Sequence, residues 1–308
     1  GEYITGQTYQ GHDAVAVRPA GLQGAMTTAL NEALSLSLID LAGEPAEEAA
    51  YSAFSVNGST ATLRLVVQEP GDSLAADDFE TAGALYKAQS GGSFTYRGLD
   101  PDEYDGSFRQ VSGEGQADLA PLIEFIRWVE ESTDEQFASG LGERLDVASL
   151  ARYLVLHNLL LDFDDMTGPG QNYYLWWDSS TEQFTVVSWD LNLSWSGDPT
   201  RGPFEQGAMA GPGGAAGPQG GGLVPGVGQA PSGQMPGGGA PPAGGPRPGG
   251  QTAPGGVLPS QGGPPQAGDG PVAAMGGTLL AERFLEVDEF RALYEDATFL
   301  SSPWRGLN

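Results

Sequence analysis

The sequence contains no cysteine, a single lysine, two histidines and no long hydrophobic run. Without cysteine, neither a disulfide framework nor a zinc site built on thiolates can form. No apolar stretch reaches the ~18 residues that a transmembrane helix requires, so we expect no membrane span. The lack of cysteine is compatible with a reducing or an oxidising compartment.

Basic residues are scarce relative to acids. The chain has 40 Asp and Glu against 13 Lys and Arg, which gives a formal net charge of −27. This charge repels the phosphates of nucleic acids and of anionic lipids, so we expect no nucleic-acid partner. An acidic composition rich in Arg is typical of organisms from high-salt or GC-rich backgrounds, because salt screens the self-repulsion. A halophilic origin is therefore one hypothesis.

Glycine and proline are concentrated in one segment. Residues 201–277 hold 27 of the 48 glycines and 15 of the 23 prolines, with almost no clusters of large apolar residues. A segment of this composition cannot bury a core, so we interpret it as a disordered insertion. About 230 residues remain, which is enough for one domain with a sizeable core. We expect that domain to comprise residues 1–200, completed by a C-terminal helix within residues 278–308.

The first half of the chain predicts strands with one covering helix. Alternating apolar residues at 14–17 indicate a strand. A helix is predicted over 22–41, and the residues expected to form its buried stripe recur at spacings of three and four: Met26, Leu30, Leu34, Leu38 and Leu41. Asn57-Gly58 predicts a tight hairpin between strands at 51–56 and 60–68. Residues 97–117 are polar and rich in turn formers.

The second half predicts mostly helices and one hairpin. Asp118 and Asp146 are suited to cap helices that run to about Glu131 and Leu161, and we expect these two helices to pack on each other. Aromatic and β-branched runs at 172–177 and 184–189 predict a hairpin with a longer loop. Asp288 is suited to cap a final helix. The fold class expected from this pattern is α+β.

Asp164, Asn172 and Asp190 are the candidate functional residues. Phosphoryl transfer needs a carboxylate that orients the attacking hydroxyl and oxygen ligands that hold Mg²⁺ on the nucleotide phosphates. Protein kinases supply an Asp and an Asn five residues apart, followed by an Asp just past a short hairpin. The order is the same here, although the first gap is eight residues.

Other interpretations of these residues remain. A series of Asp, Asn and Asp is common in ordinary loops. A carbohydrate-binding or hydrolase-like module could use Asp164 and Asp190 as paired acids, but Asn172 would then be unexplained. His157 fits a core histidine on the apolar stripe of its helix better than a catalytic base.

Two motifs in this region resemble the spore-coat CotH kinase family of atypical, kinase-like proteins. Residues 168–176 (G-P-G-Q-N-Y-Y-L-W) are similar to the family's G-x-G-x-N-Y-Y-L-Y motif. Residues 189–192 (W-D-L-N) match its W-D-hydrophobic-Asp/Asn signature. Weaker similarity extends through Asn57-Gly58, 67–69, 85–87 and 283–294.

The resemblance implies a protein-kinase-like fold and transfer of phosphate from ATP to protein Ser or Thr with Mg²⁺. It implies Asp164 as the catalytic acid, with Asp165 as its rival, and Asn172 and Asp190 as metal ligands. It also implies that Glu69 lies near the adenine and Lys87 near the phosphates. The alternatives for these last two are a surface Glu before a turn and a solvated Lys.

One part of the family pattern has no evident counterpart. The family carries an R-G-x-S/T stretch and a basic strand near its N-terminus, so we expect this chain, which opens at Gly1, to be a fragment or a degenerate member. The alternative function is a noncatalytic surface or spore-coat protein that retains the fold for assembly or adhesion. Either function places the protein outside the cell or at its surface, with a surface or coat protein as partner. The sequence does not define the oligomeric state.

Overall fold

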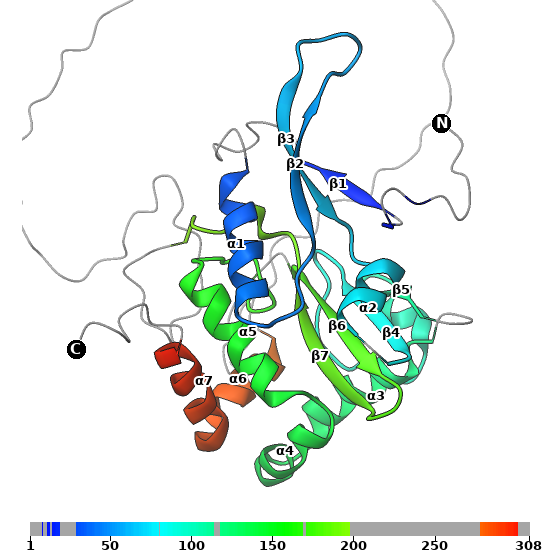
Figure 1. Ribbon diagram of the computed structural model, residues 1–308. Helices are drawn as coiled ribbons and strands as arrows, with labels where there is room; N and C mark the ends of the chain where they lie inside the picture. Colours follow the sequence, from blue (N-terminus) through cyan, green and yellow to red (C-terminus); the bar gives the residue numbers. More distant parts are fainter. Residues whose placement is uncertain are drawn as a thin grey trace, which may run out of the picture. The chain divides into compact units, whose positions relative to one another are not determined.

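The computed structural model describes residues 8, 11–12, 14–18, 29–79, 81–113, 118–168, 171–197 and 278–300. These residues belong to one compact unit, which combines residues up to 212 with residues from 274 onward. The unit contains helices and two antiparallel sheets, so the fold class is α+β (Figure 1). No helix in the described ranges has the length and apolarity to cross a membrane. The predictions for 201–277 and for the start of the first helix lie outside these ranges.

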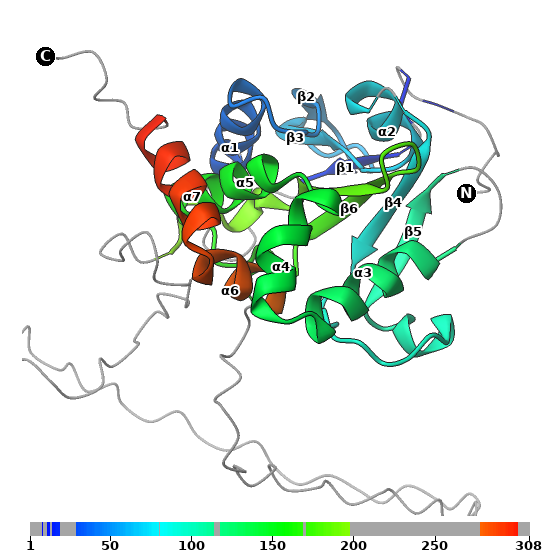
Figure 2. The same cartoon turned by 90° about the horizontal axis from the view of Figure 1, so that it is seen from below.

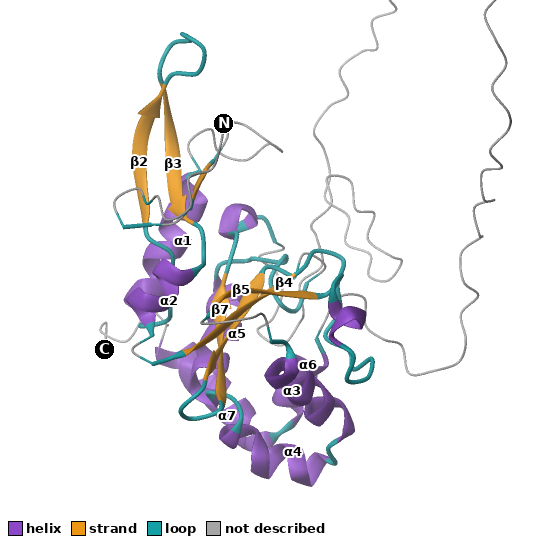
Figure 3. Ribbon diagram, turned by 90° about the vertical axis from the view of Figure 1, so that its right-hand side faces the viewer, coloured by secondary structure: helices purple, strands orange, loops and turns teal. Residues whose placement is uncertain are grey.

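The first sheet has three strands in the order β1-β3-β2, with β1 at Val15–Val17, β2 at Ala49–Phe54 and β3 at Thr62–Gln68. Figure 3 shows β2 and β3 as a hairpin set apart from the second sheet. Asn57 and Gly58 both have positive φ, as the turn prediction requires. The loop is longer than predicted, however, because the strands end at Phe54 and Thr62. Serine side chains bond to the backbone within the loop and replace ladder hydrogen bonds there.

The helix α1 (Leu30–Leu41) buries a different face from the one that the sequence predicted. Leu30, Leu34, Leu38 and Leu41 are exposed, whereas Glu32, Ser35, Leu36 and Ile39 are buried. Leu36 and Ile39 pack with Leu65 and Val67 of β3. The leucine periodicity was misleading because the opposite face carries polar groups that bond to other parts of the fold.

Those polar groups tie α1 to residues 192–195. Asn31 Nδ2 donates to the carbonyl oxygens of Asn192 (2.7 Å) and Ser194 (3.3 Å). Trp195 Nε1 donates to Ser35 Oγ over 3.2 Å. A buried face with satisfied hydrogen bonds can therefore replace an apolar one.

The second sheet has four strands in the order β5-β4-β6-β7: β4 is Gly83–Ala88, β5 is Phe108–Ser112, β6 is Tyr173–Asp178 and β7 is Gln183–Ser188. Both faces are covered. One packs against the main helical core, and the other packs in a smaller core with α2 (Asp72–Asp78). Trp176 lies in the smaller core and Trp177 against the main one, as alternating faces predict. At Gly83 a Cβ atom would lie 2.1 Å from the Trp177 carbonyl oxygen, so a side chain there would force the strands apart.

The remaining helices form the main core with this sheet. They are α3 (Ala120–Glu131), α4 (Asp134–Gly140), α5 (Val147–Leu159), α6 (Leu279–Glu286) and α7 (Asp288–Leu300). Asp146 caps α5 by accepting from two backbone amides, as predicted. Figure 2 shows α5 beside α7 and α3 near α6, in place of the expected direct packing of α3 on α5. The C-terminal helices α6 and α7 thus take the positions beside α3 and α5 that we expected these two helices to occupy for each other.

The inverted burial of α1 makes a paired prediction. Leu36→Ala should lower the free energy of unfolding by about 2–5 kcal/mol, because it leaves a cavity beside β3. Leu34→Ala, on the exposed face of the same helix, should change it by no more than about 0.5 kcal/mol. Urea unfolding of the two variants gives the comparison, and a larger loss for Leu34→Ala would contradict the observed orientation of α1.

Candidate functional site

The loop after α5 brings Asp164 and Asn172 together. Asn172 Nδ2 donates to Asp164 Oδ2 over 3.0 Å, and the Asn172 amide donates to the Asp164 carbonyl over 3.2 Å. Both side chains are half-buried. The eight-residue gap between them therefore closes into a loop whose ends meet.

Asp165 has a different environment from Asp164. Its carboxylate is buried and accepts from the backbone amide and hydroxyl of Thr167, at 2.9 and 2.7 Å. Burial raises the pKa of Asp165, and the nearby His157 works against that rise. Asp165 shapes the turn, which leaves Asp164 as the accessible acid of the two.

Gly168 fits the loop for a steric reason. A Cβ atom at this position would lie 1.8 Å from the Phe163 carbonyl oxygen. Gln171 Nε2 donates to the Gly168 carbonyl, and Gln171 itself has a positive φ. The first glycine of the G-P-G motif is thus explained by the close approach of two backbone segments, and Pro169 and Gly170 lie outside the described residues.

Asp190 stands two residues after β7, in the left-handed region with φ 54° and ψ 53°. This conformation is costly for a residue other than glycine and is found mainly where the surrounding structure enforces it. The next residues form a short 3₁₀ helix, Leu191–Leu193, whose Leu191 is fully buried. The buried 3₁₀ helix anchors the chain on one side of Asp190, and β7 anchors it on the other.

Arg18, which the spacing of the motifs did not indicate, joins Asp190 to α1. Its Nε donates to Glu32 Oε1 over 2.9 Å, and its Nη2 also contacts that oxygen. The same Nη2 lies 2.7 Å from Asp190 Oδ1, without the alignment of a hydrogen bond. Residues 18, 32 and 190 therefore form one ion cluster that connects the first sheet, its helix and the segment after β7.

A sequence signal for this cluster was present. Residues 14–18 read A-V-A-V-R, which parallels the V-A-I-K strand of protein kinases with Arg in place of Lys. In kinases that lysine pairs with a helix Glu, as Arg18 pairs with Glu32.

Negative charge exceeds positive charge around Arg18. Burial alone lowers the pKa of Arg18, but Glu32, Asp190 and Glu47 together raise it above its ordinary value. Burial raises the pKa of Glu32 even though Arg18 works against that rise. Burial is thus the main cause of the shift at Glu32, whereas the neighbouring acids cause the shift at Arg18.

Glu47, which lies just before β2, is the third carboxylate. It is 4% exposed, and neither of its carboxylate oxygens has a hydrogen-bond partner in another described residue. Burial raises its pKa to about 8, and Glu32 adds to the rise. The group is therefore a neutral acid at pH 7, because ionisation would leave a buried charge with too little compensation.

Lys87, predicted from the family resemblance, lies in the electrostatic surroundings of Asp190, and Glu69, predicted in the same way, lies in those of Lys87. Lys87 is half-buried on β4, with its Nζ 4.7 Å from the ring centroid of Trp189 and 5.4 Å from that of Tyr174. Burial lowers the pKa of Lys87, while Glu69 and Asp190 oppose that change. The lysine is thus not a freely solvated side chain, and Glu69 is near enough to influence it.

The described residues offer few side chains that could bind Mg²⁺. In the described ranges no group of three or more His, Cys, Asp and Glu side chains is arranged to hold a metal ion. Mg²⁺ usually keeps several waters and takes one or two carboxylates together with substrate phosphates. Asp190 offers one such carboxylate, and Asn172 keeps its amide oxygen available because its amide nitrogen is the atom that donates to Asp164.

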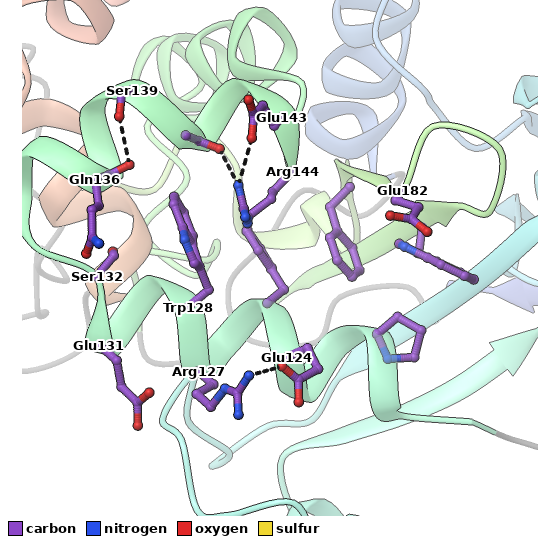
Figure 4. A pocket seen from close by; sticks show the side chains of 15 residues that line it. Glu124, Arg127, Trp128, Glu131, Ser132, Gln136, Ser139, Glu143, Arg144 and Glu182 are labelled. Carbon is purple, nitrogen blue, oxygen red and sulfur yellow. Dashed lines mark hydrogen bonds and ion pairs between the residues drawn. The ribbon is translucent and has the colours of Figure 1, made fainter.

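Two described cavities lie away from these residues. One of about 730 Å³ is lined by α3, α4 and the β6–β7 hairpin, and Figure 4 shows Trp128 and Arg144 inside it. Its arginines pair locally, Arg127 with Glu124 and Arg144 with Glu143. The second, of about 650 Å³, lies beside α2 and Trp176. None of Glu69, Lys87, Asp164, Asn172 and Asp190 lines either cavity.

The ion cluster predicts unequal costs for removing two arginines. Arg18→Met should destabilise the fold by about 3–5 kcal/mol, because Glu32 stays buried without its cation. Arg127→Met, which breaks an exposed pair, should cost no more than about 1 kcal/mol. Adding Glu32→Gln to Arg18→Met should recover part of the loss. Urea unfolding measures all three, and equal costs for the two single variants would contradict a buried cluster.

Glu47 predicts a specific pH dependence. In the unfolded chain its carboxyl ionises near the ordinary pKa of 4.5, whereas in the fold it keeps its proton to about pH 8. The unfolded state therefore releases a proton that the folded state retains, so Glu47 makes stability fall as pH rises through this window. Glu47→Gln should remove that contribution, about 3 kcal/mol by pH 7. Parallel stability curves for the two proteins between pH 5 and 8 would refute a neutral Glu47.

A family model described as CotH kinase protein matches residues 3–298, a range that includes the ion cluster, the Asp164 loop and the C-terminal helices. A search of curated protein sequences returned no significant match. Because the family model covers nearly the whole chain, this protein belongs to the CotH kinase family.

Proposed function

We propose that this protein is a kinase-like phosphotransferase that moves the γ-phosphate of ATP to a Ser or Thr hydroxyl of another protein. The observation that carries the proposal is the contact of Arg18 with both Glu32 and Asp190. Active protein kinases require a basic strand residue paired with a helix Glu, and a metal-binding Asp beyond a hairpin. Here the three corresponding residue types meet, although they are far apart in sequence.

The chain's own residues have separate parts in this reaction. Asp164 orients the attacking hydroxyl and accepts its proton as the new oxygen–phosphorus bond forms and the bond to ADP breaks. Asn172 holds the Asp164 carboxylate in place through its amide nitrogen. Arg18 and Lys87 supply positive charge near Asp190, where the phosphates would lie.

Asp190 and the Asn172 amide oxygen are the groups that would hold Mg²⁺. When bound, Mg²⁺ neutralises charge on the transferred phosphate. Glu69, in the surroundings of Lys87, is the residue we assign to the adenine side of the site.

A noncatalytic role in assembly is the second candidate. It is favoured by one observation, the row of exposed leucines on α1, since soluble proteins seldom leave such a stripe uncovered. In that role the Arg18–Asp190 contact would be structural, and the protein would act at a cell or spore surface. A surface location is part of both proposals.

Calorimetry with Mg²⁺ and ATP tests the catalytic proposal. The unmodified chain should bind Mg²⁺·ATP, and Asp190→Asn should weaken binding at least about tenfold by removing a metal ligand. Asp164→Asn should leave binding nearly unchanged but lower transfer from radiolabelled ATP to a basic, serine-rich model protein by about 10²-fold or more.

Asp296→Asn is the matched control, since it makes the same chemical change on the exposed face of α7. It should alter neither binding nor transfer. If the unmodified chain neither binds Mg²⁺·ATP nor transfers phosphate, the catalytic proposal fails and the assembly role is favoured.

A further inference from the structure

His157 uses both of its ring nitrogens inside the core. It lies on α5 and is 1% exposed, which confirms the prediction of a core histidine. Nδ1 lies 3.1 Å from Asp162 Oδ2, and Nε2 lies 2.9 Å from Ser188 Oγ. A histidine that only filled space would not need two polar partners from different segments.

Each of the two partners of His157 lies two residues before one of the candidate site acids. Asp162 comes two residues before Asp164 and accepts from the Asp164 amide through Oδ1 over 3.3 Å. Ser188 ends β7 and comes two residues before Asp190. His157 therefore connects the loop that carries Asp164 with the strand that delivers Asp190.

The surroundings fix the orientation of the imidazole. The Tyr153 ring lies with its centroid 4.1 Å from that of His157, and the Tyr153 hydroxyl accepts from the Met166 amide over 3.2 Å. Asp165 Oδ2 lies 3.9 Å from Nδ1 on the same side as Asp162. When Nδ1 donates to Asp162, Nε2 either accepts from or donates to the Ser188 hydroxyl, so the link holds in the neutral and the charged ring.

A hydrolytic triad of Ser188, His157 and Asp162 has the same order of groups but does not fit the burial. All three side chains are buried, and Ser188 lies at the end of a strand that is packed on both faces. A nucleophilic serine must reach a substrate carbonyl. The arrangement is therefore suited to holding parts of the fold together.

We propose that His157 is a positioning residue, which sets the Asp164 loop and the Asp190 segment at a fixed separation through hydrogen bonds to Asp162 and Ser188. The consequence for catalysis rests on the proposed function, in which Asp164 and Asp190 act on the same phosphate. The hydrogen bonds of His157 to Asp162 and Ser188, which we call the link, do not depend on that function. Supporting shells of this kind matter because misplacement of about 1 Å can cost about 10²-fold in rate.

Two substitutions separate the two halves of the link. The amide of an Asn side chain falls near the position of Nδ1, and that of a Gln side chain near Nε2. His157→Asn should keep the bond to Asp162 and lose that to Ser188, and His157→Gln should do the reverse. Ser188→Ala deletes one hydroxyl and should reproduce the effect of His157→Asn, which keeps the test usable if a His157 variant fails to fold.

Hydrogen–deuterium exchange of the full chain tests the link and does not require an assay of catalytic activity. His157→Asn and Ser188→Ala should speed exchange in residues 189–195 by about tenfold, the loss of one buried hydrogen bond, and leave 163–168 unchanged. His157→Gln should instead speed exchange in 163–168. Ser149→Ala is the control, because it removes a buried serine bond to Glu44 from the same helix and should affect neither segment.

Phosphate transfer supplies the second measurement. If His157 positions the two acids, Ser188→Ala should lower kcat by about 10-fold to 100-fold with little change in KM for ATP. Identical exchange patterns for His157→Asn, His157→Gln and Ser149→Ala would overturn the link. If the exchange pattern appears but the unmodified chain transfers no phosphate, the link stands and the proposed function fails.

Discussion

The ion cluster of Arg18, Glu32 and Asp190 is the interaction on which the arrangement of this protein depends. It brings the residue after β1, a buried acid of α1 and the segment after β7 together around one half-buried cation. A buried charge without an opposite charge beside it destabilises a fold. Arg18 and its acidic neighbours are tolerated together because each has a partner of opposite charge. Removing Arg18 would leave Glu32 buried without its cation, so the cluster helps to fix how the first sheet and α1 meet the segment after β7.

The same requirement explains why α1 turns its leucines outward. Only one face of a helix can point at Arg18, and Glu32 lies on that face with Asn31 and Ser35 beside it. Leu36 and Ile39 are the apolar residues close enough to this face to be buried with it. Polar contacts thus decided the rotation of the helix, at the cost of exposing its most regular hydrophobic stripe.

Much of the framework could be predicted from local sequence. Asp146 as a cap, Asn57-Gly58 as a turn and the aromatic hairpin before Asp190 are signals that act over a few residues. The burial of α1 could not be predicted because it is decided by contacts with residues about 160 positions away. β5 was missed because residues 97–117 look like turns, and α4 was missed although Thr133 and Gln136 form a capping box.

The candidate site also contains some residues that could be predicted from local sequence and others that could not. Asp164, Asn172 and Asp190 lie in one stretch, so their order alone suggested a shared role. Arg18 and Glu47 are distant in sequence from that stretch, and the fold brings them into the electrostatic surroundings of Asp190. His157 was recognised as buried, but its two partners depend on the meeting of a loop and a strand end.

The packing of α5 against α7 has a consequence for how the chain is made. The partner of α5 lies more than a hundred residues later, beyond the segment rich in glycine and proline. At typical translation rates the ribosome needs on the order of ten seconds to cover that distance. During this interval the apolar side of α5 has been synthesised and its cover has not. The fold is therefore completed only when the C-terminal helices have been made. A chain released before that point would leave the apolar side of α5 exposed and prone to aggregation.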